Sequence, residues 1–410
     1  MTFTSALAQA LAADVLERFL RYVRVDTQSS PDSGEEPSTP GQLDLGRLLV
    51  EELRAIGLED AAMDDGGFVF ATLPGEGPTI GLLAHVDTTP EVVGAGVEPI
   101  VHRGYGGGAI ELPRGGTVLD PAAMPVLAGK AGHDIVTSSG DTLLGADDKA
   151  GVAEIMAAVA HLVAHPELPR PTVRVGFTPD EEIGLGATRF DIEGFGATCA
   201  YTLDGSQPGE LQDESFSAVG VTVTFRGVDV HPGWATGKLV NATRLAARFL
   251  AALPPELTPE ATRDREGFVH AYEVDATTAR AQIKLIVRDF DDELLERHVS
   301  LVRRTAEQVA ADVDVHVKPQ YSNMRRHLEA FPDVVERAAR AIRAEGLEVV
   351  RVPIRGGTDG SILSARGLPT PNLFTGGHEY HSTREWASVQ DMASAAAVIV
   401  RLAAEWAVLP

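Results

Sequence analysis

The strongest constraint on the fold is an alternation of strand-like and helical patterns along most of the chain. Short apolar runs typical of buried strands occur at residues 79–86, 173–177 and 199–203. Between the first two of them, apolar residues recur at helical spacing over residues 152–163. Strands that alternate with helices favour a mostly parallel sheet with helices on both faces. The sequence therefore predicts an α/β domain.

One block of the chain has a different order. From about residue 215 to residue 321, strand-like and helical patterns follow one another as β-α-β-β-α-β, which is the order of a ferredoxin-like α+β unit. Such a unit is self-contained, and 410 residues are too many for one ordinary core. We therefore expect an α/β domain in two parts, residues 1–214 and 322–410, interrupted by an inserted domain at residues 215–321.

Charge and cysteine content narrow the possible partners and the setting. The formal net charge of −24 repels nucleic-acid backbones and anionic membrane surfaces, so neither partner is expected. Cys199 is the only cysteine, which excludes an intrachain disulfide and a cysteine-based zinc site. The N-terminal stretch at residues 6–20 has acidic residues and no basic leader, so it predicts an amphipathic helix and not a signal peptide. A cytoplasmic protein is expected.

Acids and histidines follow the ends of several predicted strands. In chain order they are His85 and Asp87, Asp147 and Asp148, Asp180, Glu181 and Glu182, Asp204, and His378 and His381. Ligands of an open α/β sheet bind where the strands end, so these segments should converge. Imidazole and carboxylate groups without a thiolate suit zinc, cobalt or manganese. The set exceeds the needs of one tetrahedral ion, which indicates two ions with a bridging carboxylate.

Each segment alone also has a plainer interpretation. A His-x-Asp pair is usually a surface or core contact, and Asp147-Asp148 could be a solvated turn at the start of a helix. Glu181-Glu182 could be solvated charge at a helix start. Together, however, carboxylates gathered at one sheet edge repel strongly unless cations neutralise them. The combined pattern favours a metal centre.

Several stretches resemble the motifs of a dinuclear zinc peptidase family that includes carboxypeptidase G and succinyl-diaminopimelate desuccinylase. The metal-site motifs are matched at residues 85–87, 145–149, 180–184 and 201–205. Further stretches, among them residues 26–29, 230–233, 288–291 and 354–360, resemble the aminopeptidases of that family. The match runs through nearly the whole chain in the same order. It implies an enzyme that hydrolyses a peptide bond.

The resemblance also implies a division of the metal ligands. One zinc ion is assigned to His85 and Asp204, and the other to Glu182 and His381, while Asp147 bridges the two. Co²⁺ or Mn²⁺ could replace Zn²⁺ at such ligands. His378 is an alternative to His381, but the family places its ligand directly after an aromatic residue, as His381 follows Tyr380.

Three further roles complete the catalytic site that the resemblance implies. Two cations lower the pKa of a bridging water towards neutrality, which gives a metal-bridging hydroxide at working pH. Glu181 is the expected general base, which takes the water proton and returns it to the leaving amine. Asp87 is expected to hold the ring of His85 in its ligating orientation. Asp148 is expected to fix the turn after the bridge without binding metal.

The resemblance implies that residues 1–214 and 322–410 form the catalytic domain and that the inserted domain is a lid or dimerisation domain. Substrate recognition is expected from the inserted domain and from the segment that follows it. In the resembling enzymes a histidine of the inserted domain stabilises the scissile carbonyl across a homodimer, and His231 matches it. Arg288 and Arg355 could pair with the C-terminal carboxylate of a short peptide, and Asn241 is a weaker candidate. Simple exposure of His231 and surface ion pairs of the arginines are the plainer interpretations.

The sequence thus predicts a zinc-dependent homodimer that removes the N-terminal residue from short peptides, preferably tripeptides. The length preference comes from the resemblance. A carboxypeptidase or an N-acyl amino acid deacylase with the same metal pair is an alternative, because the water attack is common to all three. An inactive binding protein is disfavoured by the intact Glu181. A nucleotide site at the glycines of residues 104–108 lacks the phosphate-binding helix and its Lys-Ser/Thr pair.

Overall fold

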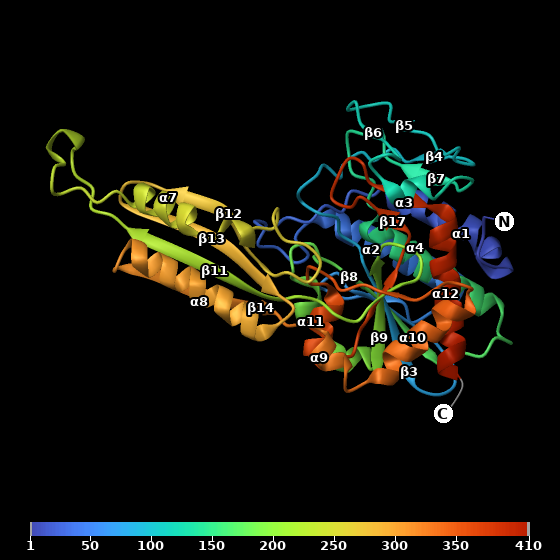
Figure 1. The fold of residues 1–410 in the computed structure, drawn as a ribbon. Coiled ribbons are helices and arrows are strands. Elements are labelled where there is room, and N and C mark those ends of the chain that lie inside the picture. Colours follow the sequence, from blue (N-terminus) through green and yellow to red (C-terminus); the bar gives the residue numbers. More distant parts are fainter. Residues whose placement is uncertain (1, 408–410) are drawn as a thin grey trace. The chain divides into compact units, whose positions relative to one another are not determined.

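The computed structural model describes residues 2–407, which divide into two compact units (Figure 1). Unit 1 consists of the chain up to Asp213, of Arg326–Val352 and of the chain from Thr358 onward. Unit 2 consists of Glu214–Arg325 and Pro353–Gly357. The predicted fold class is confirmed, since unit 1 has a large, mostly parallel sheet and unit 2 is a separate antiparallel α+β unit.

An eight-stranded sheet forms the centre of unit 1. In spatial order its strands are β1 (Ala62–Met63), β2 (Val69–Leu73), β8 (Thr172–Thr178), β3 (Thr79–His85), β9 (Cys199–Gly205), β16 (Asn372–Phe374), β10 (Glu210–Gln212) and β15 (Val350–Arg351). The central strand β3 runs parallel to β8 and β9, and β16 runs parallel to β9. The carboxyl ends of these four strands therefore meet at one edge, where the predicted acids and histidines follow them.

Helices cover both faces of this sheet. On one face α4 (Ala146–Ala164) packs against β3 and β9, and α1 (Ala6–Tyr22) and α12 (Val389–Ala407) pack against α4. On the other face a phenylalanine-rich core joins the sheet to α5 (Gly186–Arg189), α6 (Ile192–Phe195) and α11 (Asp359–Ala365). The remaining helices of unit 1 are α2 (Pro40–Ile56), α3 (Pro125–Ala128), α9 (Arg325–Leu328) and α10 (Pro332–Ala344). Burial on both faces explains why the central strands are continuous apolar runs.

A smaller set of strands in unit 1 was not expected from the sequence. They form a four-stranded antiparallel sheet and a two-stranded hairpin around the buried Trp386. The sheet contains β17 (Gly377–His378), β18 (Trp386–Ser388), β7 (Ile135–Thr137) and β4 (Ile100–His102), and the hairpin contains β5 (Ile110–Glu111) and β6 (Val118–Leu119). Each strand has only two or three residues, which is too short for alternation of apolar and polar residues to appear in the sequence.

Unit 2 has the connectivity that the sequence predicts. In chain order it contains β11 (Ser217–Arg226), η1 (Pro232–Trp234), α7 (Ala242–Ala252), η2 (Pro255–Leu257), β12 (Phe268–Ala276), β13 (Arg280–Asp289), α8 (Asp292–Val309) and β14 (Val313–Tyr321). The strands pair in the order β12-β13-β11-β14, and every pair is antiparallel. Alternate residues of β13 are buried, and α7 and α8 pack against this strand. This is a ferredoxin-like arrangement.

The segment Pro353–Gly357 also belongs to unit 2, although it follows the expected end of the insertion. The backbone N–H of Phe216 donates to the carbonyl oxygen of Ile354 at 3.0 Å, so this segment pairs with the start of unit 2. Arg355 therefore lies in the same unit as Arg288.

Within residues 2–407, none of the helices combines the length and the apolar character needed to span a bilayer.

Candidate metal centre

Two histidines of unit 1 face the same carboxylate. His85 is the last residue of β3, and its Nε2 lies 2.9 Å from Oδ1 of Asp147. His381 follows β17, and its Nε2 lies 3.4 Å from Oδ2 of the same residue. Asp147 stands in the first turn of α4. Each oxygen of one carboxylate thus faces a different imidazole, which is the arrangement that a carboxylate bridging two ions requires.

Two more acids complete the cluster. Glu182 Oε2 lies 3.0 Å from His381 Nε2, and its Oε1 is buried without a hydrogen-bond partner among the described residues. Asp204, near the end of β9, places Oδ1 3.8 Å from His85 Nε2. Two groups of potential ligand atoms lie within 4.8 Å of one another, namely His85 with Asp147 and Glu182, and His85 with Asp148 and Asp204.

Asp148 belongs to the second group by distance, but its oxygens already have partners. Its Oδ2 accepts a hydrogen bond from the backbone N–H of His85 at 3.2 Å, and its Oδ1 accepts one from Gly151 at 3.2 Å. The side chain is only 1% exposed. We therefore assign it to the turn that begins α4 and take Asp147, whose oxygens face the two imidazoles, as the better ligand.

Asp87 connects two of the strand ends. Its carboxylate accepts hydrogen bonds from the backbone N–H groups of Glu181 at 2.9 Å and Glu182 at 3.1 Å. Its Oδ1 also lies 3.4 Å from Nδ1 of His85, and its backbone oxygen lies 3.1 Å from the same nitrogen. Asp87 is completely buried. It therefore fixes the His85 ring and the turn that carries both glutamates.

Glu385 is a member of the site that the sequence did not reveal. Its Oε2 accepts hydrogen bonds from the backbone N–H groups of Leu144 at 2.7 Å and Gly145 at 2.8 Å, and its Oε1 accepts one from Asp147 at 3.1 Å. It is 1% exposed, and burial raises its pKa to about 7. Glu385 therefore holds the backbone that presents the Asp147 carboxylate. It stands outside every motif, so no sequence signal pointed to it.

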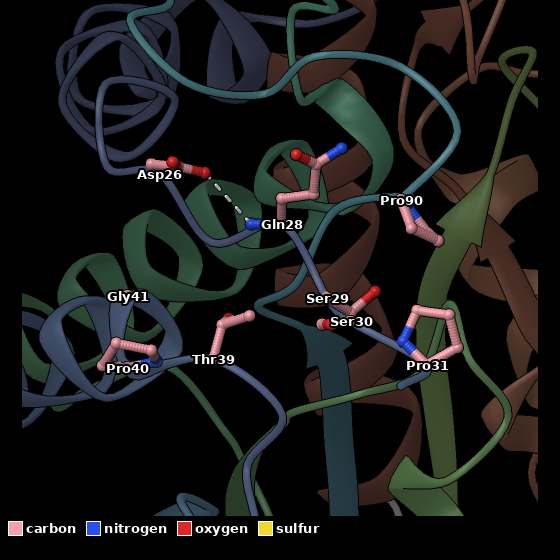
Figure 2. Close-up of a pocket in the computed structure, with 9 residues that line it drawn as sticks. All are labelled: Asp26, Gln28, Ser29, Ser30, Pro31, Thr39, Pro40, Gly41 and Pro90. Atoms are coloured by element: carbon pink, nitrogen blue, oxygen red, sulfur yellow. Dashed lines mark hydrogen bonds between the residues drawn. The ribbon is translucent and has the colours of Figure 1, made fainter. Parts of the chain in front are cut away.

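Asp180 anchors the polar loop of residues 27–41 to the turn before Glu181. This buried residue has a left-handed backbone (φ 58°), and its carboxylate accepts from Ser38 N at 2.9 Å, Gln42 Nε2 at 2.8 Å and Arg189 at 3.0 Å. Asp180 is therefore a buried anchor and not a solvated acid. The polar loop also lines a cavity of about 510 Å³ (Figure 2). Its lining residues are Asp26, Gln28, Ser29, Ser30, Pro31, Thr39, Pro40, Gly41 and Pro90.

The electrostatics of the cluster indicate a need for positive charge. Burial raises the pKa of Glu182 to about 7, and it raises the pKa of Asp204 well above its usual value with help from the charge of Asp147. Burial alone would lower the pKa of His381, but hydrogen bonds to Asp147 and Glu182 raise it to about 11. The same balance raises the pKa of His85. These directions have one cause, which is the crowding of several buried carboxylates around two imidazoles, and cations at this point would relieve it.

The donor set fits a pair of divalent metal ions. It offers the imidazole of His85 with several carboxylate oxygens in the two groups, and the imidazole of His381 lies beside Asp147 and Glu182 although it belongs to neither group. Such groups are zinc, cobalt or manganese ligands. The buried Oε1 of Glu182 lacks a hydrogen-bond partner among the described residues, and a buried carboxylate oxygen without one is costly. A cation at this point would provide what the oxygen lacks.

Glu181 stands beside these ligands without a comparable partner. Its backbone is held by Asp87, while its side chain is half-buried. Burial, together with the charges of Asp359 and Asp204, raises its pKa well above the usual value, against the opposing charge of His85. A carboxyl group with a raised pKa can both accept and return a proton, as a general base does.

His378, the alternative to His381, has a different environment. Its Nδ1 lies 2.9 Å from the hydroxyl of Ser206, and its ring packs 4.1 Å from the ring of Trp386. It is 6% exposed, and burial, assisted by the charge of Lys130, lowers its pKa to about 3. These contacts suit a neutral core histidine that supports the loop, and they favour His381 as the ligand.

In unit 2, His231 lies on an exposed loop at the start of η1. Its Nδ1 accepts a hydrogen bond from the backbone N–H of Gly233 at 3.1 Å, so the neutral ring carries its proton on Nε2. The ring of Trp234 lies 4.5 Å away. Asn241 caps α7, because its side chain accepts from Arg244 N at 3.2 Å. Helix capping gives Asn241 a structural reason to be present.

Arg288 and Arg355 are neighbours in unit 2. Arg288 donates to the carbonyl oxygen of Arg355 at 3.4 Å, and both guanidinium groups lie over the ring of Phe268. Arg355 also donates to Thr262 at 3.0 Å and to the backbone oxygen of Asp264 at 3.1 Å. Within residues 2–407 neither arginine forms an ion pair with a carboxylate, so the surface-pair interpretation of Arg288 finds no support.

The glycine next to Arg355 has a packing role. A Cβ at Gly357 would meet the ring of Tyr321 at 2.6 Å, which is closer than real Cβ contacts. Gly357 is thus required by packing within unit 2. Close approach of a ligand to the backbone is not needed to explain it.

Comparisons with known proteins agree with the site. The model of peptidase family M20/M25/M40 matches residues 143–405. A peptidase T from Shouchella clausii is 47% identical over 95% of this chain and 97% of its own, and a peptidase T from Vibrio parahaemolyticus is 45% identical with the same coverage. The crystal structure of aminopeptidase PepT from Bacillus cereus has a TM-score of 0.74 and 26% identity, covering 97% of this chain and 99% of that chain.

Proposed function

The chain belongs to peptidase family M20/M25/M40 and is a metal-dependent aminopeptidase, and from this premise we propose that it holds two zinc ions and removes the N-terminal residue from short peptides, preferably tripeptides. One observation carries the proposal. The two oxygens of Asp147 face two different histidines, at 2.9 Å from His85 and 3.4 Å from His381. A site for a single ion does not require this arrangement.

In this proposal five side chains hold the two ions. His85 and Asp204 hold one ion, Glu182 and His381 hold the other, and Asp147 is shared. When bound, two such ions acidify a water molecule and polarise the scissile carbonyl. Asp87 keeps Nε2 of His85 directed at the ligands, since its carboxylate and backbone oxygens lie close to Nδ1.

Proton transfer is assigned to Glu181. Its carboxylate takes a proton from the attacking water and delivers it to the nitrogen of the leaving amine. The raised pKa of Glu181 suits both halves of this transfer, because a weakly basic carboxylate would accept the first proton poorly. The hydrogen bond from its backbone N–H to Asp87 at 2.9 Å keeps the turn in place during the exchange.

Residues of unit 2 are proposed to read the substrate. The Nε2–H of His231 is free to donate to the carbonyl oxygen as negative charge develops on it, because Gly233 occupies Nδ1. Arg288 and Arg355 offer two guanidinium groups to the C-terminal carboxylate of the peptide. Asn241 remains a weak candidate for this task.

The proposed assembly is a homodimer through unit 2, and the proposed setting is the cytoplasm. The strands β12 and β14 stand at the two edges of the unit 2 sheet, and no further strand of residues 2–407 pairs with their outer sides, so either could extend the sheet with a second copy. The cytoplasmic setting relies on the single cysteine, since Cys199 cannot form an intrachain disulfide.

A substrate panel tests the proposal most simply. Purified enzyme, analysed for bound metal, is offered free tripeptides, dipeptides, tetrapeptides and N-acetylated tripeptides, together with N-acyl amino acids. The expected result is release of the N-terminal residue, fastest from free tripeptides, with two zinc ions per chain. Preference for N-acyl amino acids, or release of the C-terminal residue, would refute the aminopeptidase assignment.

A further inference from the structure

Glu91 is an acid outside the proposed ligand set that lies against one of its histidines. Its Oε2 is 3.7 Å from Nδ1 of His381, while Nε2 of the same ring faces Glu182 at 3.0 Å. The two nitrogens of His381 therefore have carboxylates on opposite sides. The Glu91 side chain is 72% exposed, and within residues 2–407 it has no Lys or Arg partner.

The chemistry of imidazole determines which nitrogen of His381 carries the proton in this contact. A histidine that binds a metal through Nε2 offers the lone pair of that nitrogen, so the ring proton must sit on Nδ1. In His381 that proton would point towards Glu91. A carboxylate in this position fixes the tautomer and the ring orientation, and it makes the ligating nitrogen more basic.

The other histidine of the centre has the same arrangement. Nε2 of His85 faces Asp147 at 2.9 Å, and its Nδ1 lies 3.1 Å from the backbone oxygen of Asp87 and 3.4 Å from the carboxylate of the same residue. Both rings thus point Nε2 inwards and Nδ1 towards an acid. Asp87 follows His85 closely in sequence, whereas Glu91 is remote in sequence from His381, so only the folded chain brings the second pair together.

The backbone that carries Glu91 is well anchored. Nε2 of Gln28 donates to the carbonyl oxygens of Thr89 at 3.0 Å and Val92 at 2.7 Å, on either side of it. The backbone N–H of Glu91 donates to the hydroxyl of Thr89 at 3.3 Å. Gln28 and Pro90, the residue before Glu91, both line the cavity that Figure 2 shows. The backbone of Glu91 is therefore fixed, although its side chain is exposed.

His381 needs such a partner more than His85 does. His85 is 3% exposed and sits at the end of a central strand, so packing limits its ring. His381 is 37% exposed on a loop with a left-handed backbone (φ 55°). His381 therefore has fewer neighbours that limit its rotamers. A carboxylate beside Nδ1 restricts the orientation of the ring where packing does not.

From these contacts we propose that Glu91 is a positioning residue that orients His381 and sets the affinity of the ion this histidine holds. The inference rests on the proposed role of His381 as a ligand. Glu91 touches neither the reacting atoms nor the ion. Its effect on catalysis passes through the occupancy of the metal position on the His381 side.

Metal binding by the apo-protein gives the test. Zn²⁺ is titrated into metal-free wild-type protein and into Glu91→Ala, Glu91→Gln and Glu91→Asp variants, in competition with a chromophoric chelator that resolves two binding steps. Glu91→Ala is expected to weaken one step by about 10-fold and to leave the other unchanged. Glu91→Gln keeps an acceptor without charge and should lose less, and Glu91→Asp should recover part of the affinity.

Two control variants separate the possible failures. Glu379→Gln removes the same charge from an acid near His381 that pairs with Arg384 at 3.3 Å, and it should leave both steps unchanged. His381→Ala must abolish one step. If it does not, the proposed ligand set is wrong. If it does, while both steps of Glu91→Ala equal those of the wild type, only the Glu91 inference is wrong. A raised KM for peptides with unchanged zinc affinity would likewise overturn it, by assigning Glu91 to the substrate.

Discussion

The two halves of the candidate metal centre differ in their surroundings. On one side His85 and Asp87 are 3% and 0% exposed, and the carboxylate receives two backbone hydrogen bonds. On the other side His381 and Glu91 are 37% and 72% exposed, and their atoms are 3.7 Å apart. The same pairing of imidazole and carboxylate is thus built once in the core and once at the surface.

The buried half of the site keeps its geometry, whereas the exposed half is open to substrate and water. A buried and fully bonded ligand pair holds its geometry without metal, because its rotamers are limited by packing. An exposed pair leaves room for substrate and water, but its geometry depends on fewer contacts. We therefore expect the ion on the His85 side to bind more tightly, and the ion on the His381 side to exchange more easily.

The largest effect is expected from a residue that serves neither half as a ligand. Glu181→Gln removes the proposed proton acceptor while keeping the shape of the side chain, so turnover should fall by about 10²- to 10⁴-fold. Bound zinc, measured by atomic absorption, should stay at the wild-type level. Loss of an ion in this variant would show that Glu181 acts as a ligand, and an unchanged kcat would remove it from the reaction.

The buried half is tested by Asp87→Ala. This change leaves the backbone N–H groups of Glu181 and Glu182 without acceptors and frees the ring of His85. Zinc affinity should fall by about 10- to 100-fold, and each unpaired N–H should cost about 1–3 kcal/mol of unfolding free energy. Titration of zinc and chemical denaturation measure the two effects. A variant with normal stability would contradict the proposed anchoring role.

Removal of metal compares the two halves within one molecule. On addition of a chelator in excess, zinc should leave in two phases, with rates that differ by about 10-fold or more. Glu91→Ala should speed the fast phase and leave the slow phase alone. A single phase, or acceleration of the slow phase by this variant, would contradict the assignment of the open half to His381.

The smallest effect is expected from a change in the scaffold behind the site. Gln42→Leu removes the amide that donates to Asp180 at 2.8 Å and accepts from its backbone N–H at 3.0 Å. Stability should fall by about 1–3 kcal/mol, because these buried groups lose their partners. Zinc content at saturation should not change. Loss of zinc would show that the Asp180 anchor also fixes the ligands of one half.

The sequence predicted the parts of the site that follow local rules. His85 and Asp204 stand at the ends of strands, Asp147 stands at the start of a helix, and Glu182 stands in the turn that follows β8. Apolar runs reveal where such strands end. Parallel strands bring those ends to one edge, so their convergence could be expected without coordinates. His381 was chosen over His378 from the resemblance, and the contacts of His378 with Ser206 and Trp386 favour the same choice.

Other members of the site depend on contacts between residues distant in sequence. Glu385 reaches the backbone of Asp147, and Glu91 reaches His381, although neither acid belongs to a motif. The short strands around Trp386 were missed for a different reason, since strands of two or three residues show no period in the sequence. Asn241 was suggested for the substrate, yet its side chain caps α7, a role that its position before a helix also predicts.

The claim that Asp147 joins two ions can be tested by anomalous diffraction at the zinc absorption edge on crystals of the metal-loaded protein. The account predicts two anomalous peaks, one beside His85 and one beside His381, about 3.5–4 Å apart with Asp147 between them. A single peak, or a second peak beside His378, would contradict it.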